Sequence, residues 1–401
     1  MCSYLGTFPP ALAHSMIRVL SDEGDVVLDP FSGRGTTLLE ARLLGRVPLA
    51  SDLNPIAVAL SRAKNVGVEM EEVLERLAVL ERRYDPVLFV PEAEVQGENI
   101  LLIYHPHTLA QLVFLRRRLV GSPAAVDQFL VGAVLGIMHG GERQDGTSGY
   151  ASISMPNTFS MSPDYVRRFV ETKRLQRVER NVFQILREKV ERLFREDARF
   201  AASGVVTRAD AKHVSRVPEF AEHVGNVQLV VTSPPYLGVV NYARQNWIRT
   251  WFLGEDPESV TDALDDNLTL AEWLDFSEAV VTQLKGMLRP EGVAVLVIGD
   301  VAKSSRTVVS LAREFIRRLL HDEVFRYVGC LSDRLPGDAK TTRIWGDTKG
   351  KATAVDRVVI LSDATPEFQW DRLRGAFASV PDEIPKASAR QIQEYAAAFA
   401  G

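Results

Sequence analysis

The segment DPFSGRGTT, residues 29–37, lies between a short apolar strand pattern and a helical pattern. Gly33 and Gly35 allow a sharp turn with no Cβ in the way, so a ligand can approach the backbone at the carboxyl end of the strand. The segment lacks the GK[ST] of a P-loop and does not complete G-x-G-x-x-G, so neither a triphosphate nor a pyrophosphate site is indicated. Asp52 ends the next strand pattern, where a carboxylate can accept hydrogen bonds from both ribose hydroxyls. These features predict a site for a nucleoside cofactor.

The segment TSPPY, residues 232–236, follows the apolar run VQLVV. Its two prolines stiffen the backbone and remove two N–H donors, which leaves carbonyl oxygens and the Ser233 hydroxyl to accept hydrogen bonds from an amine. An exocyclic amine of a nucleobase is a poor nucleophile because its lone pair is delocalised into the ring. If Ser233 and the Pro234 carbonyl accept its two hydrogens, the nitrogen moves toward tetrahedral geometry and its lone pair becomes available.

Together these two segments resemble motifs I (DPFxGxGTT) and IV of the S-adenosylmethionine-dependent DNA amino-methyltransferases. The segment SDLNP (51–55) is similar to the ribose-binding segment of that family, TFPP (7–10) to its motif X, and TRADA (207–211) to the segment in which Asp210 would meet the adenine amino group. The resemblance implies S-adenosylmethionine as the cofactor. The cofactor-binding residues that it implies are Thr7, Phe8, Pro9, Asp29, Pro30, Phe31, Ser32, Gly33, Gly35, Thr36, Thr37, Asp52, Leu53, Asn54, Asp210 and Ala211.

The same resemblance implies a catalytic motif of Ser233, Pro234, Pro235 and Tyr236, with Tyr236 stacking on a base flipped out of double-stranded DNA. Family members with serine at the first position of this motif mostly act on cytosine N4, and those with aspartate more usually act on adenine N6. We therefore expect N4-cytosine methylation, for restriction–modification, with a cognate restriction endonuclease as a candidate partner. A C5-cytosine enzyme needs a cysteine nucleophile, and neither Cys2 nor Cys330 lies in a Pro-Cys turn.

The elements that must position these residues alternate as in an α/β protein at both ends of the chain. We expect a Rossmann-like, seven-stranded methyltransferase sheet that is mostly parallel, with one antiparallel edge strand and a large helical insertion. The expected strands are residues 25–29, 47–52, 204–207, 227–232, 292–299, 324–331 and 357–362. Helical patterns at 71–84, 108–120, 125–139 and 165–200 interrupt the α/β alternation.

The expected organisation is an N-terminal part of the catalytic domain (1–66), the insertion (67–203), a C-terminal part of the catalytic domain (204–364) and a tail (365–401). Motif order is thus X, I, insertion, IV, a permutation that preserves the geometry of the site. We expect the insertion to recognise the target DNA through its loop at residues 140–163, while the basic stretch 167–195 either follows phosphates or is a solvated helix with internal ion pairs. The residues predicted to bind the substrate are Arg143, Asn157, Tyr242, Trp247 and Arg343.

The composition is that of a globular protein, with 46% hydrophobic and 25% charged residues in 401. A net charge of -5 argues against a protein that coats nucleic acid indiscriminately. No apolar stretch has the roughly 20 residues of a membrane span, and no signal peptide is recognisable, so we expect a cytoplasmic protein. The pair His105 and His107 has no further ligand at suitable spacing, and we predict no metal site.

Three alternatives stay open at this stage. The same cleft suits an N6-adenine DNA methyltransferase, or an RNA methyltransferase acting on guanine N2. An alternative of another class is a non-catalytic S-adenosylmethionine-binding subunit that recognises DNA for a partner. The intact TSPPY segment favours an enzyme.

Overall fold

The computed structural model describes residues 1, 8–143, 145–155, 162–195, 204–235, 246–264, 268–304, 307–322, 324–334 and 351–364. The chain forms two compact units. A sheet unit comprises Gly6–Leu53, Phe200–Val240 and Asp265–Gly401, and a helical unit comprises Met1–Leu5, Asn54–Arg199 and Asn241–Leu264. The largest segment of the helical unit, Asn54–Arg199, includes most of the predicted insertion at 67–203, and the unit also takes in a segment that follows TSPPY.

The sheet unit is built on a single sheet with the strand order β3-β2-β1-β4-β5-β8-β7 and with β6 paired to β5. The strands are β1 (Val26–Asp29), β2 (Val47–Asp52), β3 (Val205–Arg208), β4 (Val227–Thr232), β5 (Leu288–Ser304), β6 (Thr307–Val309), β7 (Tyr327–Arg334) and β8 (Lys351–Ser362). Pairing is parallel from β3 through to β5, and β8 runs antiparallel to both of its neighbours. The predicted Rossmann-like, mostly parallel sheet is therefore confirmed.

The antiparallel strand β8 lies one position inside the edge, between β5 and β7, and not at the edge itself. Its residues Val358, Val359, Ile360 and Leu361 are all buried, so both of its faces require covering. A strand that is apolar on both faces is more stable inside a sheet than at its rim. Strand β7, which pairs with β8, takes the edge.

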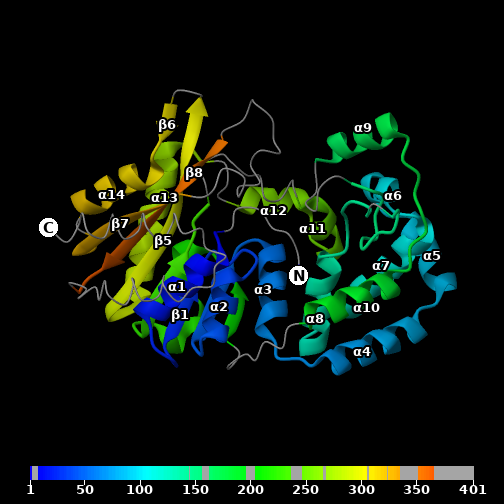
Figure 1. The fold of residues 1–401 in the computed structure, drawn as a ribbon, viewed down its shortest axis with the longest axis horizontal. Coiled ribbons are helices and arrows are strands. Elements are labelled where there is room, and N and C mark those ends of the chain that lie inside the picture. Colours follow the sequence, from blue (N-terminus) through cyan, green and yellow to red (C-terminus); the bar gives the residue numbers. More distant parts are fainter. Residues whose placement is uncertain are drawn as a thin grey trace. The chain divides into compact units, whose positions relative to one another are not determined.

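Alternate residues of β5 contribute to cores on the two faces of the sheet. Ala294, Leu296 and Ile298 pack in the core that also contains residues of α13 (Leu270–Met287) and α14 (Leu311–His321). Val293, Val295 and Val297 pack in the opposite core with residues of α1 (Pro10–Leu20) and α2 (Thr36–Leu43). This period-two alternation between two helix-covered faces is what a doubly wound sheet requires, and Figure 1 shows helices on each side of the strands.

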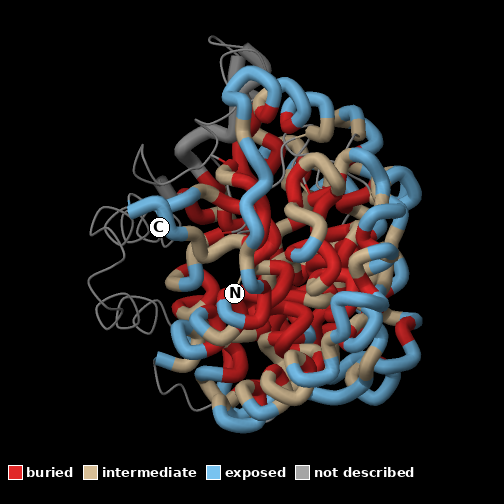
Figure 2. The backbone as a smooth tube through the Cα atoms, turned by 90° about the vertical axis from the view of Figure 1, so that its right-hand side faces the viewer, coloured by how far each residue is buried: buried red, intermediate tan, exposed pale blue. Residues whose placement is uncertain are grey.

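The helical unit has no named strand among its described residues. Its helices are α3 (Pro55–Asn65), α4 (Met70–Arg83), α5 (Pro86–Glu94), α6 (Glu98–Ile103), α7 (Pro106–Leu119), α8 (Ala125–Leu135), α9 (Pro163–Lys173), α10 (Val182–Leu193), α11 (Trp247–Leu253) and α12 (Pro257–Ala263). An aromatic cluster holds α5, α7 and α10 together, with the Phe89 and Phe114 rings 5.1 Å apart and Phe114 also near Phe183. Figure 2 shows buried backbone through the interior of this unit and exposed outer turns.

The helical pattern predicted over 165–200 is two helices, α9 and α10. The first ends at Arg174, whose φ of 50° lies in the left-handed region, and the second begins after Asn181, whose side chain accepts from the Gln184 backbone N–H at 3.2 Å. Neither glycine nor proline marks the break, so the residue periodicity carried no signal for it.

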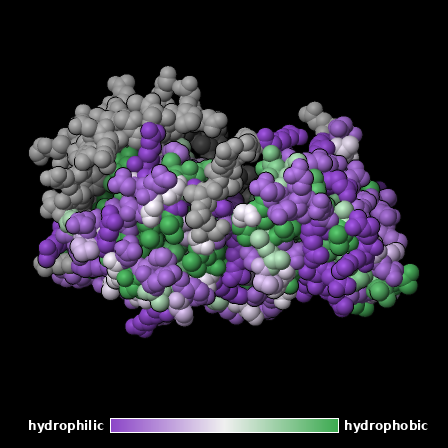
Figure 3. Space-filling view, turned by 90° about the horizontal axis from the view of Figure 1, so that it is seen from below, coloured by the Kyte–Doolittle hydropathy of each residue, from purple (hydrophilic) through white to green (hydrophobic). Residues whose placement is uncertain are grey.

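Among the described helices, none offers the long uncharged apolar stretch that a bilayer crossing requires. The face in Figure 3 is mostly hydrophilic with scattered hydrophobic patches, as on ordinary protein surfaces.

Candidate cofactor and catalytic site

The two sequence segments that could do chemistry begin at the same edge of the sheet. β1 ends at Asp29 and β4 ends at Thr232, and the two strands are parallel neighbours with Leu28 paired to Val230. Both following turns therefore leave the carboxyl ends of adjacent strands, where open α/β sheets bind their ligands.

Two buried hydrogen bonds connect these turns. The Thr232 hydroxyl donates to Asp29 Oδ1 at 2.6 Å, and the Thr37 hydroxyl at the start of α2 donates to the Val231 carbonyl at 2.9 Å. Asp29 also accepts from the Phe31 backbone N–H at 3.1 Å. The position of the first turn is thereby tied to that of the second.

Asp29 is a buried carboxyl, with only 2% of its surface exposed. Burial raises its pKa to about 7, against the hydrogen bonds from Thr232 and the Phe31 N–H, which lower the pKa by favouring the charged form. Asp52 raises the pKa slightly further through charge repulsion. The hydrogen bonds that connect the two turns therefore involve a carboxyl group, Asp29, whose pKa is near neutral.

This pKa predicts a pH dependence of stability. The pKa of Asp29 in the folded state exceeds that in the unfolded chain, so the folded state binds the proton more tightly between about pH 4 and pH 7. The free energy of unfolding therefore falls as pH rises through that window, by up to about 4 kcal/mol. We expect Asp29→Asn to remove this slope, as measured by urea unfolding at several pH values. Parallel pH profiles of the two proteins would contradict the assignment.

The first turn has the backbone geometry expected of a ligand-binding glycine turn. Gly33 and Gly35 have φ values of 49° and 73°, which residues with a Cβ rarely adopt. The Ser32 N–H donates to the Ser51 carbonyl on β2, and Gly35 donates to the Ser32 carbonyl. Pro30, Phe31 and Thr36 complete the turn, and Phe31 packs against the core beside Phe276.

Asp52 faces this turn from the end of β2. Its Oδ2 accepts from the Gly33 backbone N–H at 2.9 Å, so the carboxylate and the glycine turn are in direct contact. Leu53 follows, and its carbonyl accepts from Arg208 Nε at 3.1 Å. A carboxylate at this position is suited to ribose hydroxyls, as the sequence predicts.

Asp210 and Ala211 lie at the start of the short 3₁₀ segment after β3. Asp210 Oδ1 accepts from the Lys212 backbone N–H at 2.8 Å, so the side chain caps this segment, and Ala211 is buried. A role for Asp210 toward the adenine ring stays a prediction. Phe8 is buried in the core beneath α1, and Pro9 is the N-cap residue of that helix.

On the catalytic side, the Ser233 hydroxyl donates to the Val297 carbonyl on β5 at 2.9 Å. Because its hydrogen is committed to that carbonyl, the oxygen is oriented to accept a hydrogen bond from an amine. Trp273 Nε1 on α13 donates to the Pro235 carbonyl at 2.8 Å, while Pro234 is buried. The structure thus adds Trp273 and Val297 to the site, and sequence reasoning missed both because apolar residues within a helix or a strand indicate only a core.

The remaining predicted residues have different locations. Trp247 is buried at the start of α11, Asn54 caps α3 by accepting from the Ile56 N–H at 3.0 Å, and Arg143 is exposed on a turn of the helical unit. Thr7, Asn157, Tyr236, Tyr242 and Arg343 lie outside the described residues.

Residues 3–80 match the family model of DNA methylases. The matched residues contain the glycine turn and Asp52, and the match supports a methyltransferase whose cofactor is S-adenosylmethionine. No curated protein matches the sequence.

Among solved structures, the chain is similar to the rRNA methyltransferase aviRa from Streptomyces viridochromogenes, with 14% identity over 90% of this chain and 87% of that one and a TM-score of 0.31. It is also similar to TrmN from Thermus thermophilus, with 12% identity over 90% of this chain and 50% of that one and a TM-score of 0.30. An rRNA methylase from Streptococcus thermophilus has 7% identity over 89% and 98% of the two chains, also with a TM-score of 0.30.

Proposed function

We propose that the protein transfers a methyl group to the exocyclic N4 amine of cytosine in double-stranded DNA. The observation that carries the proposal is the 2.6 Å hydrogen bond between Thr232 and Asp29, which joins the TSPPY segment to the glycine turn at one sheet edge. A methyl donor held by the first turn and an amine held by the second would then share one site.

S-adenosylmethionine bound there supplies a methyl group on a positively charged sulfur. The donor set fits this cofactor, because Asp52 provides a carboxylate for the ribose and the glycine turn admits a ligand close to the backbone. In the proposal, the Pro234 carbonyl and the Ser233 oxygen accept the two amine hydrogens and orient the nitrogen lone pair. Methyl transfer would form the nitrogen–carbon bond as the carbon–sulfur bond breaks, would leave a neutral thioether, and would release the amine proton to solvent.

The choice of cytosine rests on serine at position 233, since an uncharged acceptor replaces the aspartate more usual for adenine. The base must leave the helix to reach such a site, and in the proposal Tyr236 stacks on the flipped base. We propose that the helical unit recognises the DNA and that methylation protects it from a cognate restriction endonuclease.

A direct assay tests this function. The purified chain is incubated with labelled S-adenosylmethionine and either duplex DNA or RNA, and the nucleic acid is digested to nucleosides. We expect label in N4-methylcytosine from DNA. Label in N6-methyladenine would correct the base, label only in N2-methylguanine from RNA would overturn the DNA assignment, and absence of label would support a non-catalytic subunit.

A further inference from the structure

Three basic side chains of α9 and its C-cap residue have no partner among the described residues. Arg168, Lys173 and Arg174 are exposed, and no hydrogen bond or ion pair joins their side chains to any residue that the structure describes. Exposed cations that are not neutralised within the protein attract a polyanion. These three residues are called the α9 basic surface below.

Some other arginines of the helical unit are neutralised by ion pairs. Arg76 Nε lies 2.8 Å from Asp127 Oδ1. On α10, Arg187 Nη2 lies 2.9 Å from Glu81 Oε2. Within the basic stretch 167–195, Arg187 is thus neutralised by a residue of α4, whereas no described residue neutralises the α9 basic surface.

The turn that contains Arg143 and Asp145–Thr147 displays an oriented guanidinium. The Arg143 N–H donates to the Thr147 carbonyl at 2.8 Å, and the Gly146 N–H donates to the Arg143 carbonyl at 3.0 Å. Asp145 Oδ1 accepts from both the N–H and the hydroxyl of Thr147, at 2.9 and 2.6 Å. Arg143 Nη1 lies 3.3 Å from the same hydroxyl, so one side of the guanidinium is held while the exposed side chain has further N–H donors.

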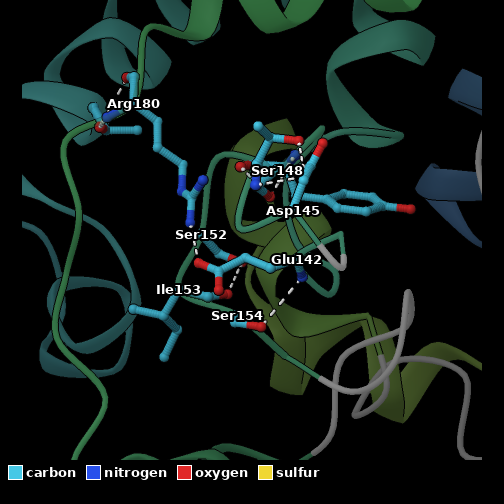
Figure 4. Close-up of polar contacts among 10 residues, drawn as sticks. Glu142, Asp145, Ser148, Ser152, Ile153, Ser154 and Arg180 are labelled. Atoms are coloured by element: carbon cyan, nitrogen blue, oxygen red, sulfur yellow. Dashed lines mark hydrogen bonds and ion pairs between the residues drawn. The ribbon is translucent and has the colours of Figure 1, made fainter.

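The turn has little net charge. Glu142 is paired with Arg180 at 2.6 Å, as Figure 4 shows. Hydrogen bonds from Thr147 lower the pKa of Asp145, so it stays ionised and balances Arg143. Because this turn is nearly neutral, it attracts phosphates only weakly. Its oriented N–H donors are well suited to hydrogen bonds with the edges of bases.

The turn and the α9 basic surface are attached to the same helix. The Ile153 N–H, on the chain returning from the turn, donates to the Ile103 carbonyl of α6 at 2.9 Å. Arg177, just after α9, donates to the Leu101 carbonyl of α6 at 2.8 Å, and α9 itself packs on α6. Both features therefore contact α6 and belong to one part of the helical unit, at the end where Figure 1 shows α6 and α9.

We propose that this part of the helical unit binds duplex DNA through two elements with separate tasks. The α9 basic surface contacts phosphates without regard to sequence, and Arg143 reads a base edge in the major groove. Guanine O6 and N7 are the acceptors that best match a guanidinium. The proposal rests on DNA being the substrate, as inferred above.

Binding at several salt concentrations tests the first task. The full chain is titrated with a fluorescent duplex DNA of mixed sequence. We expect the triple variant Arg168→Ala, Lys173→Ala and Arg174→Ala to bind DNA more weakly. The slope of the logarithm of the association constant against log salt should become less steep by about 3, since each phosphate contact contributes about 0.9.

A matched variant removes the same charge elsewhere. Arg82, Arg83 and Arg192 are likewise exposed, and in Figure 1 α4, which carries two of them, lies at the opposite end of the helical unit from α9. Replacing these three by alanine should leave the slope unchanged. Equal loss of slope in both triple variants, or no loss in the first, would overturn the phosphate assignment.

The sequences that become methylated test the second task. A pool of random-sequence duplexes is treated with the wild-type chain or with Arg143→Ala, and the modified sites are sequenced. We expect Arg143→Ala to relax the preference at one base pair by about 10-fold or more while keeping the salt slope. An unchanged sequence preference would overturn the base-reading role.

These experiments separate this inference from the proposed function. Duplex binding that depends on the α9 basic surface without any methyl transfer would defeat the function and retain the phosphate contacts. Methyl transfer to duplex DNA that is insensitive to both sets of substitutions would defeat the inference alone.

Discussion

Replacing Ser233 by alanine should lower the rate of methyl transfer by about 10²- to 10³-fold, the usual cost of removing one oriented hydrogen-bonding group from a catalytic site. The hydroxyl is held by the Val297 carbonyl at 2.9 Å, so its oxygen can accept an amine hydrogen without reorganising. Alanine removes that acceptor and leaves Asp29, Asp52 and the glycine turn in place. Single-turnover rates and cofactor affinity, measured on the same preparations, are the readouts.

The substitution also removes a hydrogen bond to β5, and this structural effect needs a control. Ser362 donates to the Gly292 carbonyl at 3.0 Å, a bond of the same kind nearer the start of β5. Ser362→Ala should cost a similar amount of stability, about 1 kcal/mol, with no loss of rate at saturating cofactor. Comparable rate losses in the two variants would show that Ser233 acts only through the sheet.

Replacing Asp52 by alanine should have the reverse pattern. We expect cofactor binding to weaken by about 10²-fold, because a carboxylate that accepts from two hydroxyls makes two charge-assisted hydrogen bonds. The Gly33 N–H also loses its acceptor at 2.9 Å, so the glycine turn becomes less well held. Calorimetric titration with S-adenosylmethionine measures the affinity, and the rate at saturating cofactor should change only a few-fold.

Asp52→Asn provides a graded variant, since its amide retains one acceptor oxygen without the charge. Its affinity should lie between those of the wild type and Asp52→Ala. If Asp52→Ala bound cofactor normally, or if it lost rate and affinity equally, the ribose assignment would fail.

The distinct outcomes expected for Ser233 and Asp52 follow from their places in the sheet. The first follows β4 and the second ends β2, with β1 between them. Because in the proposal different strand ends hold the cofactor and the substrate, we expect cofactor binding and methyl transfer to be impaired separately by the two substitutions.

Local sequence was sufficient to predict both turns and the type of sheet. The left-handed φ values at Gly33 and Gly35 and the rigid backbone at Pro234 and Pro235 are properties of the residues themselves, and their location after apolar runs indicated strand ends. Local sequence was less informative where no residue marks a boundary, as at Arg174 between α9 and α10.

The sequence by itself determined which residues could bind a nucleoside cofactor and an amine, because turn geometry and side-chain chemistry are local. The tertiary structure alone decided which distant residues meet. The Thr232 hydroxyl reaches Asp29 across 203 positions, Trp273 holds the Pro235 carbonyl, and β8 inserts between β5 and β7. Such pairings depend on how strands and helices pack to bury apolar surface over the whole chain, and no short segment contains that information.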